Sequence, residues 1–281
     1  MESYKVPKKY NYEYINLDTN SGINFLSKQK EEIKKFRIDI LKTYKMKLEL
    51  INNVAADIIS GDINSFLLER KKAEENIFKS FNKLSKGMHG EDKVRDIIYQ
   101  YDGEFKILRN ATFSVESNKI ENDFIIVDES GINTIEVKDI GSSSEKLIID
   151  KYDRVSRVNK NNFEIENYDM IQQSNRHLAY LSKFIDNKFT FDVPVNSIIV
   201  IASNIKIINE GSSNIIGPNQ IYNAIKLKNK RINQEQIKLV YKELSDNLID
   251  NIKYSYIDYI TVLNRNYNLI LKSIKELFIK Y

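Results

Sequence analysis

The sequence predicts a mixed α/β (α+β) protein, in which a mixed β-sheet is flanked by helices, with a long N-terminal helical hairpin and a C-terminal pair of helices. Apolar residues recur at helical spacing near both ends of the chain, and short β-branched runs separated by turn signals fill the middle. A helical pattern also lies between those runs and the continuous apolar run 195–202. Strand, helix and strand in this order build a mixed sheet covered by helices.

The N-terminal part of the chain is predicted to be an irregular arm followed by a helical hairpin. Residues 1–24 are polar, carry several tyrosines and show no clear periodicity, whereas 25–86 repeat apolar residues at helical spacing. The two helices are expected at about Asn24–Ile59 and Ile63–Leu84. We place the break between them at Ser60-Gly61-Asp62, because small polar residues and glycine interrupt helices.

The central segment 87–228 is predicted to form the domain that carries the sheet. Its start is placed at Gly87-Met88-His89-Gly90-Glu91, followed by an amphipathic helix from Asp92 to about Gln100. The elements expected after it are strands at 105–108, 112–115, 120–127, 132–138 and 146–150, a loop with Arg154 and Arg157, a helix from about Tyr168 to Asp186, and a strand at 195–202. The last strand is expected to be buried in the centre of the sheet, because it is continuously apolar.

The C-terminal segment 229–281 is predicted to be a helical extension. Beyond Pro218 a short helix is expected, and then two helices at about 234–250 and 252–279. Their apolar stripes and those of the N-terminal helices cannot stay exposed, so we expect the two sets to pack together. This packing can occur within one chain or between two. A homo-oligomer through the helical extensions is the favoured prediction, and a different protein partner stays open.

Composition excludes several classes of site. The chain has 281 residues with 42% hydrophobic content and no cysteine, which excludes disulfides, thiolate zinc sites and cysteine nucleophiles. Two histidines are too few for a multi-histidine metal site. The net charge of +4 is compatible with a nucleic-acid partner without requiring one. No run approaches the roughly 20 apolar residues that span a bilayer, and no secretion signal is recognisable, so we expect a soluble, cytoplasmic protein without a membrane partner.

The segment with the most functional information is a predicted β-hairpin. Its two apolar runs are separated by the turn signal Asp128-Glu129-Ser130-Gly131. If the hairpin closes symmetrically about that turn, Val127 pairs with Ile132, and Asp123 then lies opposite Glu136. Strand alternation places Lys138 on the same face as Glu136.

Two carboxylates that face each other across a sheet repel, unless something neutralises them. A divalent cation is the natural neutraliser, and Lys138 would lie beside it. Because cysteine is absent and histidine is scarce, any metal must be bound by carboxylate and carbonyl oxygens, which favours Mg²⁺ or Mn²⁺. The alternative is that Asp123 and Glu136 are solvent-facing residues of a surface hairpin.

An ordered set of four motifs resembles a known family. The motifs are Gly87-x-x-Gly90-Glu91 opening a helix, a strand with Asp123, the run Gly131-Ile-x-x-Ile-Glu136-Val-Lys138, and Gln173-x-x-x-His177 on a later helix. Over about residues 87–205 they resemble the nuclease-related domain (NERD) of the PD-(D/E)XK nuclease superfamily. The resemblance implies a mixed-sheet nuclease core and a metal-dependent phosphodiesterase.

The resemblance also implies roles for individual residues. Asp123 and Glu136 match the two acidic positions of the superfamily motif, and Lys138 matches its lysine. Both carboxylates, with the Val137 carbonyl, would hold magnesium, and Lys138 would orient the attacking water or neutralise charge on phosphorus. Glu91 would add a third acid near the metal; alternatively, it only favours the dipole of its helix.

The remaining residues of the predicted site come from a helix and a loop. Gln173 and His177 are four residues apart and share a helical face. Gln173 would hold the lysine, the water or a substrate phosphate, and His177 either packs the helix or makes a polar contact beside the site. Arg154 and Arg157 are further candidates for substrate contact.

The chain departs from the motifs at two places. Asn122 stands where the superfamily often has proline, and Asp169-Met170 replace Asn-Pro before the helix. With these departures, the sequence predicts a magnesium-dependent nuclease that acts on nucleic acid, with DNA favoured over RNA, in defence against foreign or mobile DNA. The alternatives are a non-catalytic nucleic-acid-binding or scaffold module with a nuclease-like fold, and a coiled-coil partner protein.

Overall fold

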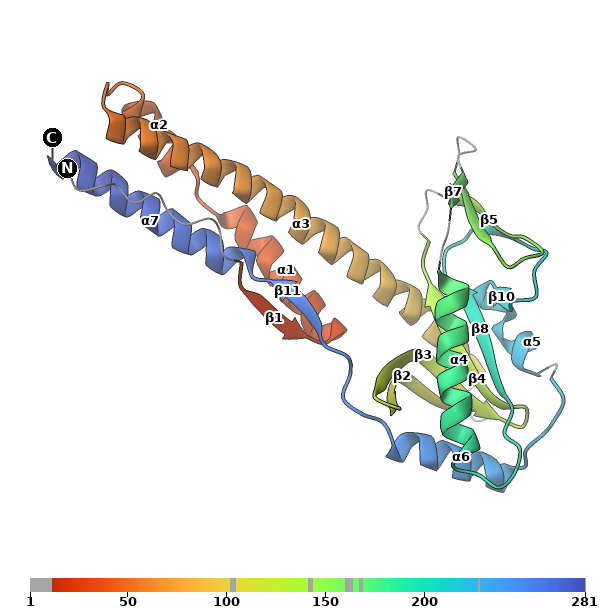
Figure 1. Ribbon diagram of the computed structural model, residues 1–281. Helices are drawn as coiled ribbons and strands as arrows, with labels where there is room; N and C mark the ends of the chain where they lie inside the picture. The colour runs from red at the N-terminus through yellow and green to blue at the C-terminus, as the bar shows by residue number, and fades with distance from the viewer. Residues whose placement is uncertain are drawn as a thin grey trace. The chain divides into compact units, whose positions relative to one another are not determined.

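The computed structural model describes residues 12–101, 105–140, 144–159, 164–166, 169–226 and 228–280. The chain divides into two units, residues 1–84 with 253–281, and residues 85–252. We refer to them as the helical unit and the sheet unit. Their elements follow in the order β1 (Tyr14–Leu17), α1 (Thr19–Lys35), α2 (Asp39–Leu48), α3 (Val54–Ile98), η1 (Tyr99–Tyr101), β2 (Lys106–Val115), β3 (Asn118–Asp128), β4 (Gly131–Lys138), β5 (Ser144–Ile149), β6 (Val155–Asn159), β7 (Glu164–Glu166), α4 (Met170–Asp186), β8 (Val195–Ile201), β9 (Lys206–Asn209), β10 (Ile215–Ile216), η2 (Pro218–Gln220), α5 (Ile221–Lys226), α6 (Gln234–Asp246), β11 (Tyr254–Ile257) and α7 (Tyr259–Lys280) (Figure 1). The predicted fold class, a mixed sheet with helices before and after it, is confirmed.

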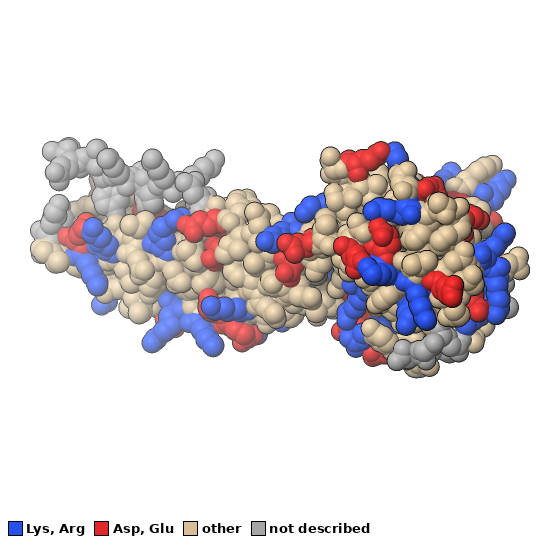
Figure 2. Space-filling view, turned by 90° about the horizontal axis from the view of Figure 1, so that it is seen from below, with Lys and Arg blue, Asp and Glu red and all other residues tan. Residues whose placement is uncertain are grey.

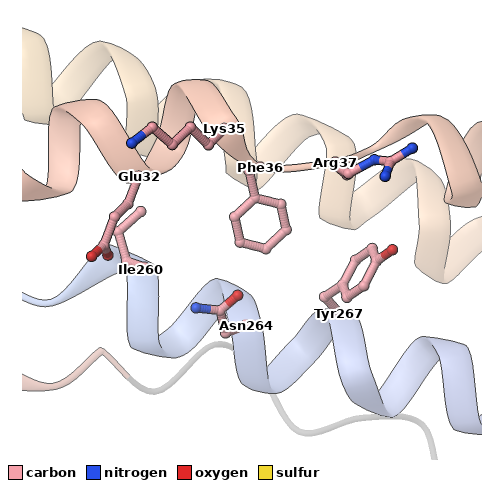
Figure 3. A pocket seen from close by; sticks show the side chains of 7 residues that line it. All are labelled: Glu32, Lys35, Phe36, Arg37, Ile260, Asn264 and Tyr267. Atoms are coloured by element: carbon pink, nitrogen blue, oxygen red, sulfur yellow. The ribbon is translucent and has the colours of Figure 1, made fainter.

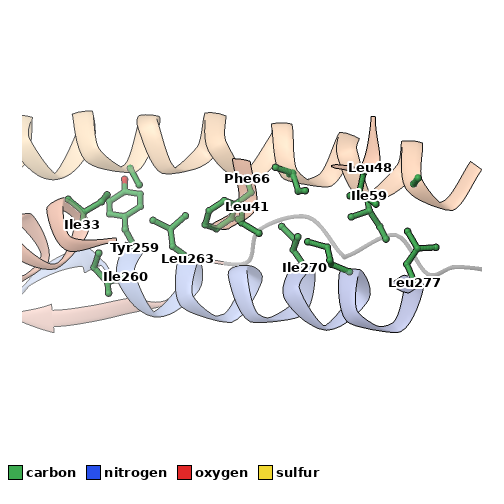
Figure 4. Packing of buried hydrophobic residues seen from close by; sticks show 14 of the residues in the cluster. Ile33, Leu41, Leu48, Ile59, Phe66, Tyr259, Ile260, Leu263, Ile270 and Leu277 are labelled. Carbon is green, nitrogen blue, oxygen red and sulfur yellow. The ribbon is translucent and has the colours of Figure 1, made fainter. Parts of the chain in front are cut away.

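The helical unit is built around one aliphatic and aromatic core. Helices α1, α2, α3 and α7 contribute to it, and β1 pairs antiparallel with β11 beside them. Figure 4 shows how α3 and α7 direct their apolar side chains toward each other, with Phe66 and Leu263 among the buried residues. One polar side chain is buried within this packing, Gln29, whose amide donates to the Ile257 carbonyl and accepts from the Tyr259 N–H.

The helical hairpin is present, but its turn lies earlier than predicted. Helix α2 ends at Leu48 and α3 begins at Val54, so residues 49–53 form the turn, and the predicted break at Ser60-Gly61-Asp62 is wrong. Helix α3 continues through Gly61 because Ile59, Ile63 and Phe66 around it are buried in one core. That burial outweighs the roughly 1 kcal/mol that glycine costs in a helix.

The predicted new helix start at Gly87–Glu91 is wrong for the same reason. Helix α3 runs on to Ile98, and Val94 and Ile98 are buried against the sheet. Glycine is needed at position 90 for a different purpose. A Cβ there would lie 3.2 Å from the Ala202 Cβ and 3.3 Å from the Asp139 Cβ, so the absence of a side chain lets the helix approach the strand ends.

Two terminal segments also differ from prediction. Residues 1–11 of the predicted irregular arm lie outside the described residues, but 12–24 contain β1 and the start of α1, whose N-terminus Asp18 caps through the Ser21 N–H. The predicted helix at 252–279 begins only at Tyr259, because residues 254–257 pair with β1. Pairing with a distant strand is a long-range contact that helical periodicity does not report.

The main sheet of the sheet unit has the strand order β10-β8-β4-β3-β2. Strands β2, β3 and β4 are antiparallel, whereas β8 runs parallel to β4 and to β10. The predicted strand at 195–202 is confirmed as an interior strand, because β8 is paired on both sides. The two short strands expected at 105–108 and 112–115 are one strand, β2, since its ladder with β3 runs from Lys106 to Val115.

The predicted hairpin register is confirmed. Val127 pairs with Ile132, and the ladder continues to Phe124 and Ile135. Asp123 and Glu136 are the next residues outward on the two strands. The register arises because the turn at 128–131 is fixed by Asp128, which accepts hydrogen bonds from the Ser130 N–H and hydroxyl.

Helices cover both faces of this sheet. On one face α4 and α6 pack against β2 and β3, through buried residues such as Phe113, Ile125 and Leu181. On the other face the end of α3 and the short α5 pack against Phe124 and Val200. Helix α6 thus packs within the sheet unit and not against the N-terminal helices as expected, whereas α7 does pack against them.

A second sheet has the order β7-β6-β5-β9. The segment expected to be a loop with Arg154 and Arg157 therefore contains strand β6, which pairs with β5. The predicted helix start at Tyr168 lies outside the described residues, and α4 begins at Met170. Among the described residues, no helix is long and apolar enough to cross a membrane.

Candidate active site

The predicted site lies where β3 and β4 meet α4. Strand β3 carries Asp123, and β4 carries Glu136 and Lys138. Helix α4 carries Gln173 and His177 on consecutive turns. The backbone holds Asp123 directly, because its Oδ2 accepts a hydrogen bond of 2.6 Å from the Val137 N–H. This bond ties the two acidic strands together at their open end.

Lys138 is the centre of a hydrogen-bonded group. Its Nζ donates to Glu136 Oε1 at 2.6 Å and to Gln173 Oε1 at 2.9 Å. The other carboxylate oxygen of Glu136 lies 3.5 Å from His177 Nδ1. Glu136 is only 7% exposed, so these contacts replace the water that an ionised carboxylate would otherwise need.

The electrostatics of the two facing carboxyl groups differ. Burial raises the pKa of Asp123 well above its usual range, and the charges of Glu136 and Glu91 raise it further, while the Val137 N–H and Lys138 oppose the rise. Burial also acts against ionisation of Glu136, but His177 and Lys138 outweigh it and bring its pKa below the ordinary value. A positive charge beside Asp123 would remove this asymmetry.

Glu91 lies close enough to influence both carboxyl groups. Its pKa is raised by burial and by the charges of Glu121, Asp92 and Glu136, against the lowering effect of Arg109, whose guanidinium is 3.7 Å away. Because α3 begins at Val54, Glu91 is far from that helix's N-terminus, and a role for it in favouring the helix dipole is excluded. Glu91 thus lies within electrostatic range of Asp123 and Glu136.

The types of ligand atom at the site suit a hard divalent cation. Asp123, Glu136 and Glu91 offer carboxylate oxygens and Val137 a carbonyl, which are the ligands of Mg²⁺ or Mn²⁺. As the side chains stand, no group of three or more His, Asp or Glu among the described residues could hold a metal ion. Lys138 occupies one oxygen of Glu136 instead, and so supplies the positive charge there.

The two predicted arginines have other contacts. Arg154 forms an ion pair of 2.6 Å with Asp150 on the exposed β5–β6 hairpin. Arg157 donates to the Ile140 carbonyl at 3.4 Å, which places it near the chain that leaves β4, two residues beyond Lys138. Arg157 therefore contacts the segment that directly follows β4, whereas the ion pair of Arg154 lies within the β5–β6 hairpin.

Arg109 is a site residue that the sequence reasoning missed. Its guanidinium donates to Asp92 at 2.9 Å, lies 3.7 Å from Glu91 and stacks over Phe124, the neighbour of Asp123. Alternation along β2 could not have indicated this role, because the partner acids come from a helix whose position depends on tertiary packing. Arg109 partly balances the charge of Glu91 and Asp92.

Surface charge does not mark an extended binding area on the one face that Figure 2 draws. On the face drawn in Figure 2, Lys and Arg are interspersed with Asp and Glu, and neither sign dominates a large area. This agrees with the small net charge of +4.

A mixed sheet with Asp on one strand, Glu-x-Lys on the next and Gln from a helix on the lysine defines a nuclease-like core. Residues 86–202 match the model of the family described as nuclease-related domain. This match confirms the resemblance for that segment and supports a nuclease-related function. Neither the curated proteins nor the solved structures contain a match to this chain.

Proposed function

We propose that this protein is a metal-dependent nuclease that hydrolyses phosphodiester bonds of DNA. The observation that carries the proposal is that Lys138 bonds both Glu136 and Gln173, while Asp123 is bonded to the N–H of Val137, the residue between Glu136 and Lys138 in sequence. The pKa of Asp123 responds to the charges of Glu136, Lys138 and Glu91. A buried cluster of acids with a single hydrogen-bonded lysine costs stability, so it is favoured where it serves chemistry.

Each side chain has a role that its contacts support. Asp123, Glu136 and the Val137 carbonyl would hold a magnesium or manganese ion, which supplies a Lewis acid and an activated water when it is bound. The Lys138 ammonium would orient the attacking water and neutralise charge that develops on the phosphate. Gln173 accepts from that ammonium and so fixes its direction, and His177 lies against Glu136.

A second candidate is a non-catalytic module that binds nucleic acid with the same fold. The favouring observation is the 2.6 Å contact between Lys138 and Glu136, which already neutralises one carboxylate without a metal ion. In that case Lys138 and Glu136 form an ion pair with a structural role. The two candidates differ in whether a divalent cation binds and whether a phosphate ester is cleaved.

The test is a cleavage assay with the purified full chain. Plasmid, linear duplex, single-stranded DNA and RNA are incubated with Mg²⁺, with Mn²⁺ and with a chelator. We expect metal-dependent cleavage of DNA that Glu136→Gln abolishes and that Glu129→Gln, an acid in the hairpin turn, leaves intact. Binding without cleavage under every condition would favour the second candidate, and cleavage that persists in Glu136→Gln would place the activity outside this site.

We further propose a role against foreign or mobile DNA, because nuclease-like domains joined to helical extensions suit such systems. A bacterial host that expresses the wild-type chain should restrict phage growth or plasmid entry, and the same host with Glu136→Gln should not. Equal restriction by both chains would show that the defence role does not depend on catalysis.

The proposal includes a homo-oligomer through the helical unit. Met46, Leu50 and Ile279 are large apolar side chains that remain mostly exposed there. Burial against a second copy would remove them from water. Light scattering should give about twice the mass of the chain, and Leu50→Lys with Ile279→Lys should reduce it to one chain. A mass of one chain for the wild type would remove the homo-oligomer from the proposal.

A further inference from the structure

A pocket in the helical unit lies at the bend between α1 and α2. It has a volume of about 290 Å³, which is close to the lower limit for ligand sites. Its lining comes from the end of α1, the residues after it and the first half of α7, namely Glu32, Lys35, Phe36, Arg37, Ile260, Asn264 and Tyr267 (Figure 3). All of these residues belong to the helical unit, so the pocket is separate from the candidate active site.

Two cations at this pocket form no hydrogen bond or ion pair with the described part of the chain. These are Lys35 and Arg37, and both are exposed. Other lysines of α1 are engaged: Lys34 pairs with Glu31, and Lys30 lies over the Phe81 ring. With one acid in the lining, Glu32, the pocket carries a net positive charge that suits an anion.

The aromatic part of the pocket is fixed by the core behind it. The Phe36 and Tyr267 rings are 5.6 Å apart and nearly perpendicular, and Phe66 lies within 6.0 Å of both. Figure 3 shows Phe36 directed from the bend toward α7 and Tyr267 directed back toward Arg37. Both rings are half-buried, so part of each stays accessible from the pocket. Rings held in this way offer a surface for a planar apolar group.

We propose that this pocket binds a nucleotide, with the base against Phe36 and Tyr267 and the phosphate bound by Lys35 and Arg37. The exposed side chains of these two cations extend in opposite directions in Figure 3 and would turn inward to reach the phosphate. Bases stack on aromatic side chains whatever their sequence, and lysine and arginine neutralise phosphate. Asn264 lies within the lining and can hydrogen-bond a base edge or a sugar hydroxyl. The volume suits one nucleotide, which can be a free mononucleotide or one residue of a single strand.

Other ligand classes fit the lining less well. A purely apolar ligand would leave the Lys35 and Arg37 charges without a partner, and a bare anion would leave the aromatic surface unused. An acidic peptide would satisfy the cations but gain nothing specific from two fixed rings. The nucleotide is the class that uses the charge, the rings and the amide together.

The test measures ligand binding to the full chain by calorimetry, with a chelator present so that nothing is cleaved. The probes are AMP, adenosine, inorganic phosphate and a short single-stranded oligonucleotide without terminal phosphates. We expect AMP to bind at least tenfold more tightly than adenosine or phosphate. Lys35→Ala with Arg37→Ala should weaken AMP binding by roughly 100-fold, since each charged contact contributes about tenfold. Binding of the oligonucleotide with the same loss would identify a strand as the source, and binding of AMP alone a free nucleotide.

Matched variants separate the proposal from its rivals. Lys42→Ala removes an exposed lysine of α2 outside the lining and should leave AMP binding unchanged. Phe36→Leu should weaken AMP but not phosphate, and a thermal melt shows whether that variant folds. Equal loss with Lys42→Ala, equal affinity for phosphate and AMP, or no binding of either nucleotide probe would overturn the proposal. None of these outcomes depends on whether the chain cleaves DNA.

Discussion

The helical unit and the sheet unit bury different kinds of side chain. The core of the helical unit is almost entirely aliphatic and aromatic, and Gln29 is its one polar residue among the buried side chains of the described part of the chain. The sheet unit buries many more polar groups, namely Thr112, Asn122, Asp128, Ser130, Asn133, Thr134, Glu136 and Ser174. Buried polar groups cost free energy unless they are hydrogen-bonded, so the contrast indicates where structure is constrained by more than packing.

Two sets of these buried polar groups, at opposite ends of the β3–β4 hairpin, differ in their bonding. Asp128, Ser130 and Asn133 hydrogen-bond one another, and Lys228 donates to Asn133 at 2.6 Å. That network fixes the hairpin turn and connects it to the segment after α5. Glu136, at the other end of the same hairpin, is bonded to Lys138 and lies beside half-buried Asp123. The turn network is self-contained, whereas the acids at the open end repel one another.

The largest expected effect of a single change is on catalysis in the sheet unit. Lys138→Met keeps the length of the side chain but removes the ammonium that Glu136 and Gln173 hold. We expect metal-dependent cleavage to fall by about 10²–10⁴-fold. Single-turnover cleavage of plasmid measures it. Lys119→Met, on an exposed position of β3, is the control and should retain the wild-type rate. Near-normal cleavage by Lys138→Met would move the chemistry elsewhere.

The comparison of units also predicts that shortening a core side chain of the helical unit lowers stability without changing the cleavage rate. Phe66 is fully buried in the helical unit, so Phe66→Ala should lower the free energy of unfolding of that unit by about 3–5 kcal/mol. The rate of cleavage per folded molecule should stay unchanged, because none of the proposed catalytic residues lies in that unit. Urea titration and active-site-normalised kinetics measure the two effects. A large loss of rate in the folded variant would show that the units are coupled in catalysis.

Metal addition tests the repulsion at the open end of the hairpin. A cation that binds only the folded chain should stabilise it by about 2.7 kcal/mol at a concentration 100 times its dissociation constant. Millimolar Mg²⁺ or Mn²⁺ should therefore raise Tm for the wild type. Asp123→Ala should abolish that rise, since it removes one carboxylate of the pair, while Asp153→Ala on the exposed β5–β6 turn should retain it. An equal rise in all three chains would contradict a metal site at Asp123.

The hairpin and its acids could be predicted because their signals are local. Period-two alternation and the turn at 128–131 fix the register of β3 and β4, so Asp123 and Glu136 follow by counting. The Gln173 contact with Lys138 was one of several roles open to it, and only the packing of α4 on the sheet selects that one. Arg109 could not be found in the same way, because its acidic partners belong to α3.

The assignment of α6 to the sheet unit and of α7 to the helical unit could not be predicted for a related reason. Amphipathic stripes on α6 and α7 show that each helix buries one face, but not which partner covers it. Ile237 and Leu244 of α6 pack against the sheet, whereas Leu263 and Ile274 of α7 pack with the N-terminal helices. The glycines of α3 led to a different error, because each favoured the end or the start of a helix. Their local cost predicted breaks that the burial of neighbouring residues overrides.

The smallest expected effects come from those glycines, and they differ in sign between the two units. Gly61 lies in the helical unit, is exposed and has nothing within 4 Å of an added Cβ. Gly61→Ala should stabilise the chain by about 0.5–1 kcal/mol, because alanine loses less backbone freedom on folding. Gly90 lies in the sheet unit, is buried, and would place its Cβ 3.2 Å from the Ala202 Cβ and 3.3 Å from the Asp139 Cβ. Both neighbours are first side-chain atoms at strand ends and cannot turn away, so Gly90→Ala should destabilise the chain. Denaturant midpoints of the two variants measure the signs, and stabilisation by Gly90→Ala would show that the helix does not approach the ends of β4 and β8 as closely as described.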